Sequence, residues 1–118
     1  MFKKLNHVQL CVSASQADQA KYFYSEILGL KEIDKPEYLK KNGGFWFEIA
    51  DIQLHIGIEE NQSKSKRHPA FEVDDLNQLK ELLLKNNIKI QEEISISGQN
   101  RFSFFDPFDN RIEVLEFI

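Results

Sequence analysis

The chain of 118 residues shows the same order of predicted secondary-structure elements twice, and this repeat most constrains its fold. Hydrophobic patterning predicts a strand, a helix and then three strands in each half, although the halves share little residue identity. Such a repeat predicts an α+β fold made of two βαβββ modules. We expect one domain over residues 1–118, with module one at about 1–58, a linker at 59–67 and module two at 68–118.

The first half opens with a short β-prone segment, and a helix capped by Ser13 or Ser15 follows it. This helix is expected to run to about Leu28, where Gly29 suits a left-handed C-cap. Its apolar face is formed by Ala20, Phe23, Tyr24, Ile27 and Leu28. The strands predicted in this half are residues 5–13, 30–33, 45–49 and 53–58.

The second half follows a polar segment, residues 59–67, that contains no apolar residue and reads as a linker. Asp74 or Asp75 is expected to cap a helix that ends at Asn86-Asn87. The apolar face of that helix consists of Leu76, Leu79, Leu82 and Leu83. The strands predicted in this half are residues 68–73, 88–94, 101–105 and 111–117.

Four polar residues recur in register in the two halves. His7 and His68 each open the first predicted strand of their half, while His55 and Glu113 each lie in the last. The spacing from His7 to His55 is 48 residues, and the spacing from His68 to Glu113 is 45. Corresponding positions in two similar modules are therefore occupied by side chains that can bind a metal ion.

Alternation along each strand predicts which face these side chains occupy. Val8, Leu10 and Val12 are apolar and should pack under a helix, which leaves His7 on the opposite face. The same argument applies to His55 and Glu113, whose neighbours in sequence are apolar, and to His68. We therefore expect all four side chains to line a concavity on the face that no helix covers.

The ligand set favours a divalent metal ion. The chain has three histidines, and all of them belong to this set. Imidazole nitrogens with one carboxylate suit Zn, Mn, Fe, Ni or Co, and open coordination positions allow such an ion to polarise a substrate oxygen. The competing interpretation is that each histidine is a surface or hydrogen-bonded residue, which is the commoner role for any one of them.

Four segments, spread over almost the whole chain, resemble the vicinal oxygen chelate superfamily, which includes glyoxalase I, extradiol dioxygenases, and fosfomycin- and bleomycin-resistance proteins. The resemblance implies a glyoxalase-like domain in which the two modules form a curved eight-stranded mixed sheet around a metal-centred cleft. It also implies a homodimer with shared clefts, in which His7 and His55 of one subunit meet His68 and Glu113 of the other. The segments are Leu5-Asn6-His7-Val8, residues 23–30, residues 68–76 and residues 105–113.

The resemblance assigns roles residue by residue. His7, His68 and Glu113 match the three metal ligands of dioxygenase-like and fosfomycin-resistance members. His55 stands where glyoxalase I carries a glutamate, so this residue is a candidate fourth ligand, base or substrate contact, and glyoxalase I activity is less favoured. Asp109 stands where the family usually has glycine, which a left-handed turn tolerates.

The leading functional hypothesis is a metal-dependent lyase, isomerase or dioxygenase that acts on a small oxygen-rich substrate. Glu113 is the candidate catalytic residue, as a ligand and as a proton shuttle. One alternative is a non-catalytic protein that binds small molecules or antibiotics, as bleomycin-resistance proteins do. Another is a fosfomycin-modifying thiol transferase, whose phosphonate would need the positive charge of Lys89, Arg101 or Arg111.

Further candidates for the substrate cleft come from strand alternation. Trp46 and Glu48 share the face opposite Phe45 and Phe47, although a buried structural role for Trp46 is about equally expected. On another strand, Arg101 and Ser103 share a face. Arg101 could bind a substrate anion, and its commoner role would be a surface salt bridge.

Composition excludes some classes of partner. The net charge of −4 argues against nucleic acid, which needs a basic surface. No apolar stretch approaches the length of a membrane span, so we expect no membrane partner. A single cysteine, Cys11, rules out an internal disulfide, and with no signal peptide evident it favours the cytoplasm.

Overall fold

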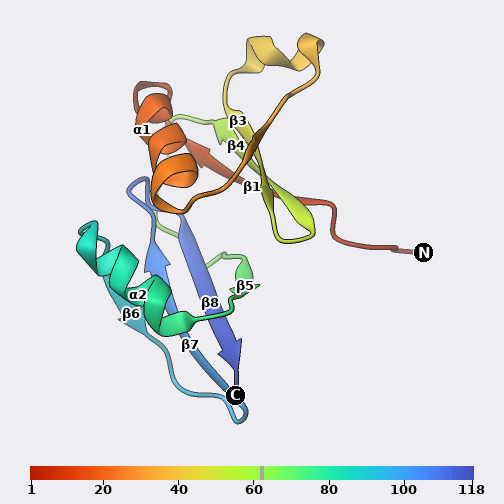
Figure 1. Ribbon diagram of the computed structural model, residues 1–118. Coiled ribbons are helices and arrows are strands. Elements are labelled where there is room, and N and C mark those ends of the chain that lie inside the picture. The colour runs from red at the N-terminus through yellow and green to blue at the C-terminus, as the bar shows by residue number, and fades with distance from the viewer. Residues whose placement is uncertain (62) are drawn as a thin grey trace. The chain divides into compact units, whose positions relative to one another are not determined.

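The computed structural model describes residues 1–61 and 63–118, so position 62 of the predicted linker lies outside the described residues. The chain divides into two compact units, Met1–Gln62 and Ser63–Ile118, which we call unit 1 and unit 2. Each unit holds a four-stranded mixed sheet and one α-helix longer than a single turn, as Figure 1 shows. The predicted α+β class with two βαβββ modules is confirmed.

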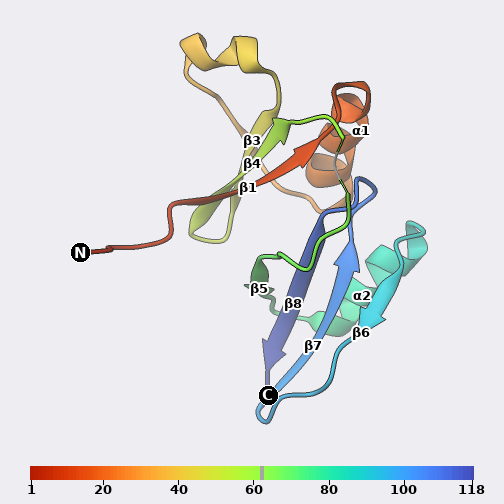
Figure 2. The same ribbon diagram turned by 180° about the vertical axis from the view of Figure 1, so that it is seen from behind.

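Unit 1 forms a sheet with the strand order β1-β4-β3-β2. The two strands farthest apart in sequence, β1 and β4, pair in parallel, and the other pairs are antiparallel. An extended N-terminal segment leads into β1 (Figure 2). The elements are β1 (His7–Val12), α1 (Ala17–Tyr22), β2 (Glu32–Ile33), β3 (Phe45–Ile49) and β4 (Ile52–Ile58).

The first helix is less regular than predicted. A 3-10 turn at Ala14–Gln16 precedes α1, and a π-helical turn at Phe23–Ile27 follows it. In that turn the Leu28 amide donates to the carbonyl of Phe23 at 2.9 Å, five residues back. Gly29 ends the helical segment with a φ of +73°, the left-handed conformation expected of it.

Unit 2 repeats the arrangement with the strand order β5-β8-β7-β6, in which β5 and β8 are parallel. The predicted cap is confirmed at Asp75, whose carboxylate accepts a hydrogen bond from the Gln78 amide at 2.9 Å. The elements are β5 (Ala70–Glu72), α2 (Leu76–Lys85), β6 (Ile90–Glu92), β7 (Gln99–Phe105) and β8 (Arg111–Phe117).

Several strand boundaries differ from the predicted ones. The strand expected at residues 68–73 pairs only over Ala70–Glu72, because Pro69 has no amide hydrogen to donate to a neighbouring strand. His68 therefore precedes β5 instead of opening it. The strand expected at residues 88–94 is similarly short, whereas β7 begins two residues earlier than expected. A 3-10 helix at Glu37–Asn42 was not predicted.

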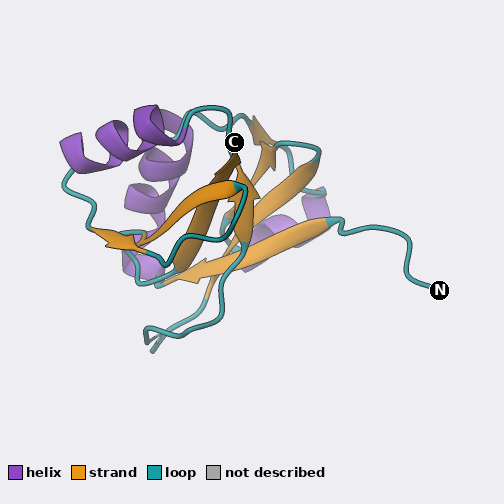
Figure 3. Ribbon diagram, turned by 90° about the horizontal axis from the view of Figure 1, so that it is seen from below, coloured by secondary structure: helices purple, strands orange, loops and turns teal. Residues whose placement is uncertain are grey.

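Each unit has its own apolar core on the face of its sheet that the helix covers; Figure 3 distinguishes the helices from the strands. In unit 1, Tyr24 from the helical segment contacts Phe47 of β3, with ring centroids 6.1 Å apart. The unit 1 core contains Val12, Ala20, Phe23, Tyr24, Phe47, Leu54 and Ile56. The unit 2 core contains Leu76, Leu83, Ile88, Phe102, Phe104, Phe108, Ile112 and Val114.

Among the described residues, no helix has the length and apolar character needed to span a membrane.

Candidate functional site

The strand register places the four predicted metal ligands at equivalent positions of the two units. In unit 1, Gln9 of β1 pairs with His55 of β4, and His7 lies two residues before Gln9. In unit 2, Ala70 of β5 pairs with Glu113 of β8, and His68 lies two residues before Ala70. His7 therefore corresponds to His68, and His55 to Glu113.

In unit 1, three rings form a continuous stack on the face of the sheet opposite the helix. The ring centroids of Trp46 and His55 are 4.0 Å apart with an interplanar angle of 4°, and those of His55 and His7 are 4.1 Å apart at 15°. The register explains the first contact, because Trp46 of β3 lies directly opposite His55 of β4. The middle ring is buried, with 7% of His55 exposed.

Hydrogen bonds fix which ring nitrogen of each stacked histidine carries the proton. His55 Nε2 lies 2.8 Å from the Gln53 amide oxygen, and His7 Nδ1 lies 2.9 Å from that of Asn6. Because these oxygens only accept, the nitrogens facing them are donors. A lone pair therefore remains on Nδ1 of His55 and on Nε2 of His7, when each ring is neutral.

The stacking limits what His7 and His55 can bind together. An imidazole binds a metal ion in the plane of its ring, along the nitrogen lone pair, at about 2.1 Å. Two nearly parallel rings with centroids 4.1 Å apart cannot both direct in-plane lone pairs at one ion. In this arrangement at most one of the two rings could direct its lone pair at a given ion.

The stack also favours the uncharged form of its central ring. Burial is the main cause that lowers the pKa of His55 to about 4, and repulsion from the neighbouring His7 and Lys35 side chains acts in the same direction. His55 is therefore neutral at physiological pH.

In unit 2, His68 and Glu113 contact each other directly. His68 Nδ1 lies 2.7 Å from the Lys66 carbonyl oxygen, which can only accept, so the proton lies on Nδ1. On the other side of the ring, His68 Nε2 is 3.3 Å from Glu113 Oε1. The same carboxylate oxygen accepts a hydrogen bond from Arg101 Nη1 at 3.1 Å.

The other predicted cleft residues of unit 2 form a polar network beside this pair. Ser103 of β7 is fully buried opposite Glu113 and donates a hydrogen bond to Glu93. Arg111 Nη2 also contacts Glu93, at 2.8 Å. Arg101 and Arg111 are thus both neutralised by carboxylates. Lys89 and Glu48 are exposed.

The structure brings the predicted ligands together in two pairs, each within one unit: His7 with His55, and His68 with Glu113. Over residues 1–61 and 63–118, no group of three or more His, Cys, Asp or Glu side chains is placed to hold a metal ion. The complete set therefore stays a prediction.

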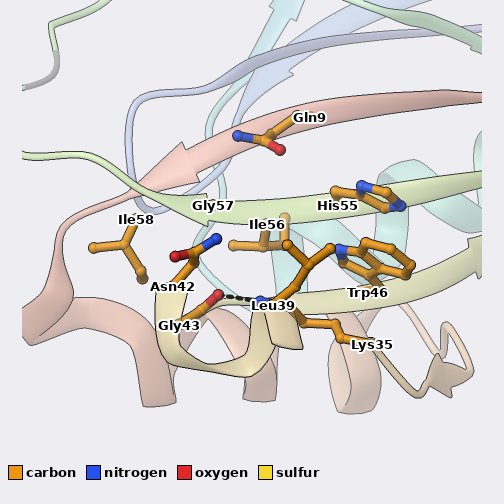
Figure 4. Close-up of a pocket in the computed structure, with 10 residues that line it drawn as sticks. All are labelled: Gln9, Lys35, Leu39, Asn42, Gly43, Trp46, His55, Ile56, Gly57 and Ile58. Carbon is orange, nitrogen blue, oxygen red and sulfur yellow. Dashed lines mark hydrogen bonds between the residues drawn. The ribbon is translucent and has the colours of Figure 1, made fainter. Parts of the chain in front are cut away.

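A cavity of ≈ 230 Å³ lies beside His55, and no sequence pattern indicated it (Figure 4). Lys35 and Asn42 line it from the segment between β2 and β3, which has no regular hydrophobic period. Gln9 of β1 also lines the cavity. The flat side chain of Trp46, a predicted cleft residue, forms part of the wall.

Comparison with known proteins identifies the family. Residues 4–114 match the model of the Glyoxalase/Bleomycin resistance protein/Dioxygenase superfamily. No curated protein gives a significant match. A Bacillus anthracis protein assigned to the glyoxalase family is 39% identical, and its crystal structure aligns with a TM-score of 0.91 over 100% of this chain and 98% of that one.

More distant solved structures share the fold. A glyoxalase/dioxygenase from Nostoc punctiforme is 25% identical, with a TM-score of 0.80 over 98% of this chain and 92% of that one. FosX, a fosfomycin resistance protein from Listeria monocytogenes, is 19% identical, and its TM-score is 0.81 over 100% of this chain and 96% of that one. FosX has also been crystallised with Mn(II) and a sulfate ion. The chain described here belongs to the Glyoxalase/Bleomycin resistance protein/Dioxygenase superfamily.

Proposed function

We propose that this protein is a metal-dependent enzyme of the glyoxalase or dioxygenase type that acts on a small oxygen-rich substrate. Its divalent ion is bound by His7, His68 and Glu113. In this proposal His55 is a supporting residue that stacks on the ring of His7. Superfamily membership makes a metal-dependent reaction a reasonable expectation, because the superfamily includes metal-dependent enzymes.

The observation that carries the proposal is the contact between His68 and Glu113. With the His68 proton on Nδ1, the Nε2 lone pair of the neutral ring faces a carboxylate oxygen 3.3 Å away. Two electron-rich atoms held this close need positive charge nearby. The Arg101 guanidinium supplies it on one side of Glu113 Oε1, and a second proton on the ring or a metal ion would supply it between the two atoms. A backbone carbonyl that fixes the distal nitrogen is the usual support of a metal-binding histidine. The donor set therefore fits a divalent ion.

The residues of the two pairs would have distinct tasks. When bound, a divalent ion polarises substrate oxygens and stabilises the negative charge that develops on them. Arg101 holds one oxygen of Glu113 and leaves the carboxylate a second oxygen for another contact. His55 and Trp46 keep the ring of His7 in place and exclude water from one side of it.

Metal analysis tests the ligand assignment. Protein purified without chelator, and apoprotein titrated with Mn²⁺, Zn²⁺, Ni²⁺, Co²⁺ or Fe²⁺, should bind about one ion per chain. Mn²⁺ is included because FosX, which shares the fold, was crystallised with it. His7→Ala and Glu113→Gln should each weaken binding by about 100-fold or more. Glu72→Gln, which removes an exposed carboxylate from β5, is the control. Wild-type protein that takes up no stoichiometric metal would contradict the proposal.

A second variant separates a ligand from a supporting residue at position 55. His55→Phe keeps a flat ring in the stack and removes the nitrogen lone pair. We expect metal affinity to change by less than about threefold, since His55 and His7 cannot both bind the ion while stacked. A loss of about 100-fold would instead make His55 a fourth ligand.

The main competing function is small-molecule binding without chemistry. The cavity beside Trp46 is the observation that favours it, because an aromatic wall combined with polar groups that can orient a ligand is typical of binding pockets. The absence of metal binding together with tight binding of a small molecule would select this alternative. The thiol-transferase alternative has less support, because Arg101 and Arg111 are paired with Glu113 and Glu93.

A further inference from the structure

The cavity beside His55 carries one positive charge and no negative charge. All of its lining residues belong to unit 1, and they come from β1, β3, β4 and the segment between β2 and β3 (Figure 4). Lys35 supplies the charge, and side-chain amides supply further hydrogen-bond donors. The polar side chains are Gln9, Lys35, Asn42 and His55, and the apolar ones are Leu39, Trp46, Ile56 and Ile58.

Lys35 is held at the cavity without a carboxylate partner. Its side chain is half-buried, and Nζ donates a hydrogen bond to the carbonyl oxygen of Gly43. Lys35 takes part in none of the ion pairs found in the described parts of the chain. An ammonium group has three donor hydrogens, so two remain for a ligand. A half-buried, unpaired cation attracts an anion more strongly than a fully solvated one does.

Two glycines of the cavity lining leave room for neighbouring side chains. Gly43 has a φ of +72°, and a Cβ there would lie 3.1 Å from Ile58 Cγ1. On β4, a Cβ at Gly57 would lie 2.5 Å from Gln9 Nε2, so the missing side chain leaves room for the Gln9 amide over the strand. The chain therefore places a carbonyl that orients Lys35 and an amide that can donate to a ligand at the same cavity.

We propose that this cavity binds the oxyanion of a small ligand, a carboxylate or a phosphonate, with Lys35 as its counter-charge and Trp46 against its apolar part. That the ligand is the substrate rests on the proposed function. Among the described residues that line the cavity, Lys35 is the one with a permanent positive charge. A volume of ≈ 230 Å³ is below the usual range for drug-sized ligands, so only a small group fits.

Fluorescence of Trp46 tests the proposal directly, since it is the single tryptophan of the chain and lines the cavity. Metal-free protein at constant ionic strength is titrated with benzoate, phenylphosphonate and neutral benzamide. At least one anion should bind about tenfold more tightly than benzamide, as expected for a partly desolvated charge pair. Lys35→Gln should remove this preference, and Lys35→Arg should keep it. Lys41→Gln, an exposed lysine outside the cavity, should behave like the wild type.

The two anions distinguish the sources of the oxyanion, because the one that binds more tightly identifies a carboxylate or a phosphonate ligand. Equal binding of benzamide, an unchanged preference in Lys35→Gln, or no response of Trp46 to either anion would overturn the proposal. The titration uses metal-free protein, so a negative result for anion binding does not depend on whether the protein binds a metal ion. Stoichiometric metal uptake without anion selectivity would reject the cavity assignment and leave the metal site standing.

Discussion

Asp106 shows how one buried carboxylate can organise a turn. It is 3% exposed; Oδ1 accepts hydrogen bonds from the amides of Phe108 and Asn110, and Oδ2 accepts one from the Asn110 side chain. The turn leads from β7 into β8 and so sets where Glu113 enters the sheet. These hydrogen bonds give Asp106 a structural role in the turn.

Replacing Asp106 by Ala should lower the free energy of unfolding by about 2–4 kcal/mol, because buried amide donors lose their acceptor. Urea denaturation measures the loss. Asp109→Gly is the control within the same turn: Asp109 is exposed with a φ of +70°, a conformation that glycine adopts without strain. It should change stability by less than about 1 kcal/mol. Equal losses in the two variants would show that the turn does not depend on Asp106.

Glu93 should make stability depend on pH in the acid range. Hydrogen bonds from Ser103 and then from Arg111 lower the pKa of Glu93 below its ordinary value of 4.5. The unfolded state then binds a proton more readily than the folded state as the pH falls. The stabilisation is fully present above the ordinary pKa and is lost as the pH falls through the folded value.

Glu93→Gln should remove this dependence. The difference in free energy of unfolding between wild type and variant should be largest near about pH 7 and should shrink towards about pH 3. Glu81→Gln, an exposed carboxylate on α2, gives the reference, and its difference should stay nearly constant. A difference for Glu93→Gln that does not change with pH would mean that its carboxylate is not selectively stabilised in the folded state.

At the scale of elements, the start of β3 depends on a glycine. Gly44 has a φ of +83°, and a Cβ there would lie 2.0 Å from the backbone oxygen of Ile56 on β4. Close approach of the two strands therefore excludes any side chain at this position. Gly98 has a similar φ of +85°, but a Cβ there would meet no atom within 4 Å.

These two glycines form a matched pair for mutation to alanine. Gly98→Ala should cost about 1–2 kcal/mol, the strain of a left-handed conformation alone. Gly44→Ala should cost at least about 2 kcal/mol more, because β3 must also move away from β4. Urea denaturation of both variants measures the difference. Similar losses would show that the strands separate at little cost.

Elements with regular periods were predictable from the sequence. Leu76 and Leu83 mark the buried face of α2, and Asp75 caps its start as expected. Strand boundaries differed from the predicted ones where pairing between strands sets them. For example, β5 begins after Pro69 and not at residue 68. The segment that carries Lys35 and Asn42 has no period, so its 3-10 helix and its cavity could not be read from the pattern.

At the scale of the whole molecule, the repeat explains which parts of the site were predictable. Spacing alone indicated that His7 corresponds to His68 and His55 to Glu113, and the strand register agrees. The spacing in the sequence could not reveal that the His7 and His55 rings stack, because the stack depends on Trp46 of a third strand. Nor could it show that Arg101 contacts Glu113, since that contact depends on the register between β7 and β8.

The predicted homodimer with shared clefts can be tested by mixing two inactive variants. If His7 of one subunit meets His68 and Glu113 of the other, His7→Ala and Glu113→Gln homodimers each lack every complete site. A heterodimer of the two variants combines both defects in one site and restores the other. Unfolding and refolding an equal mixture should therefore restore about a quarter of the metal sites, because heterodimers form half of the dimers.

Metal content per chain, measured with the subunit composition by native mass spectrometry, checks this expectation. Each variant refolded alone is the control and should hold much less metal than the refolded mixture at the same metal concentration. Ligands contributed by a single chain would give no restoration even when heterodimers form. A protein that sediments as a monomer at every concentration would contradict the predicted dimer itself. A shared cleft and a single-chain site use the same ligands. The mixing experiment therefore tests which subunit contributes each ligand, and not which residues the ligands are.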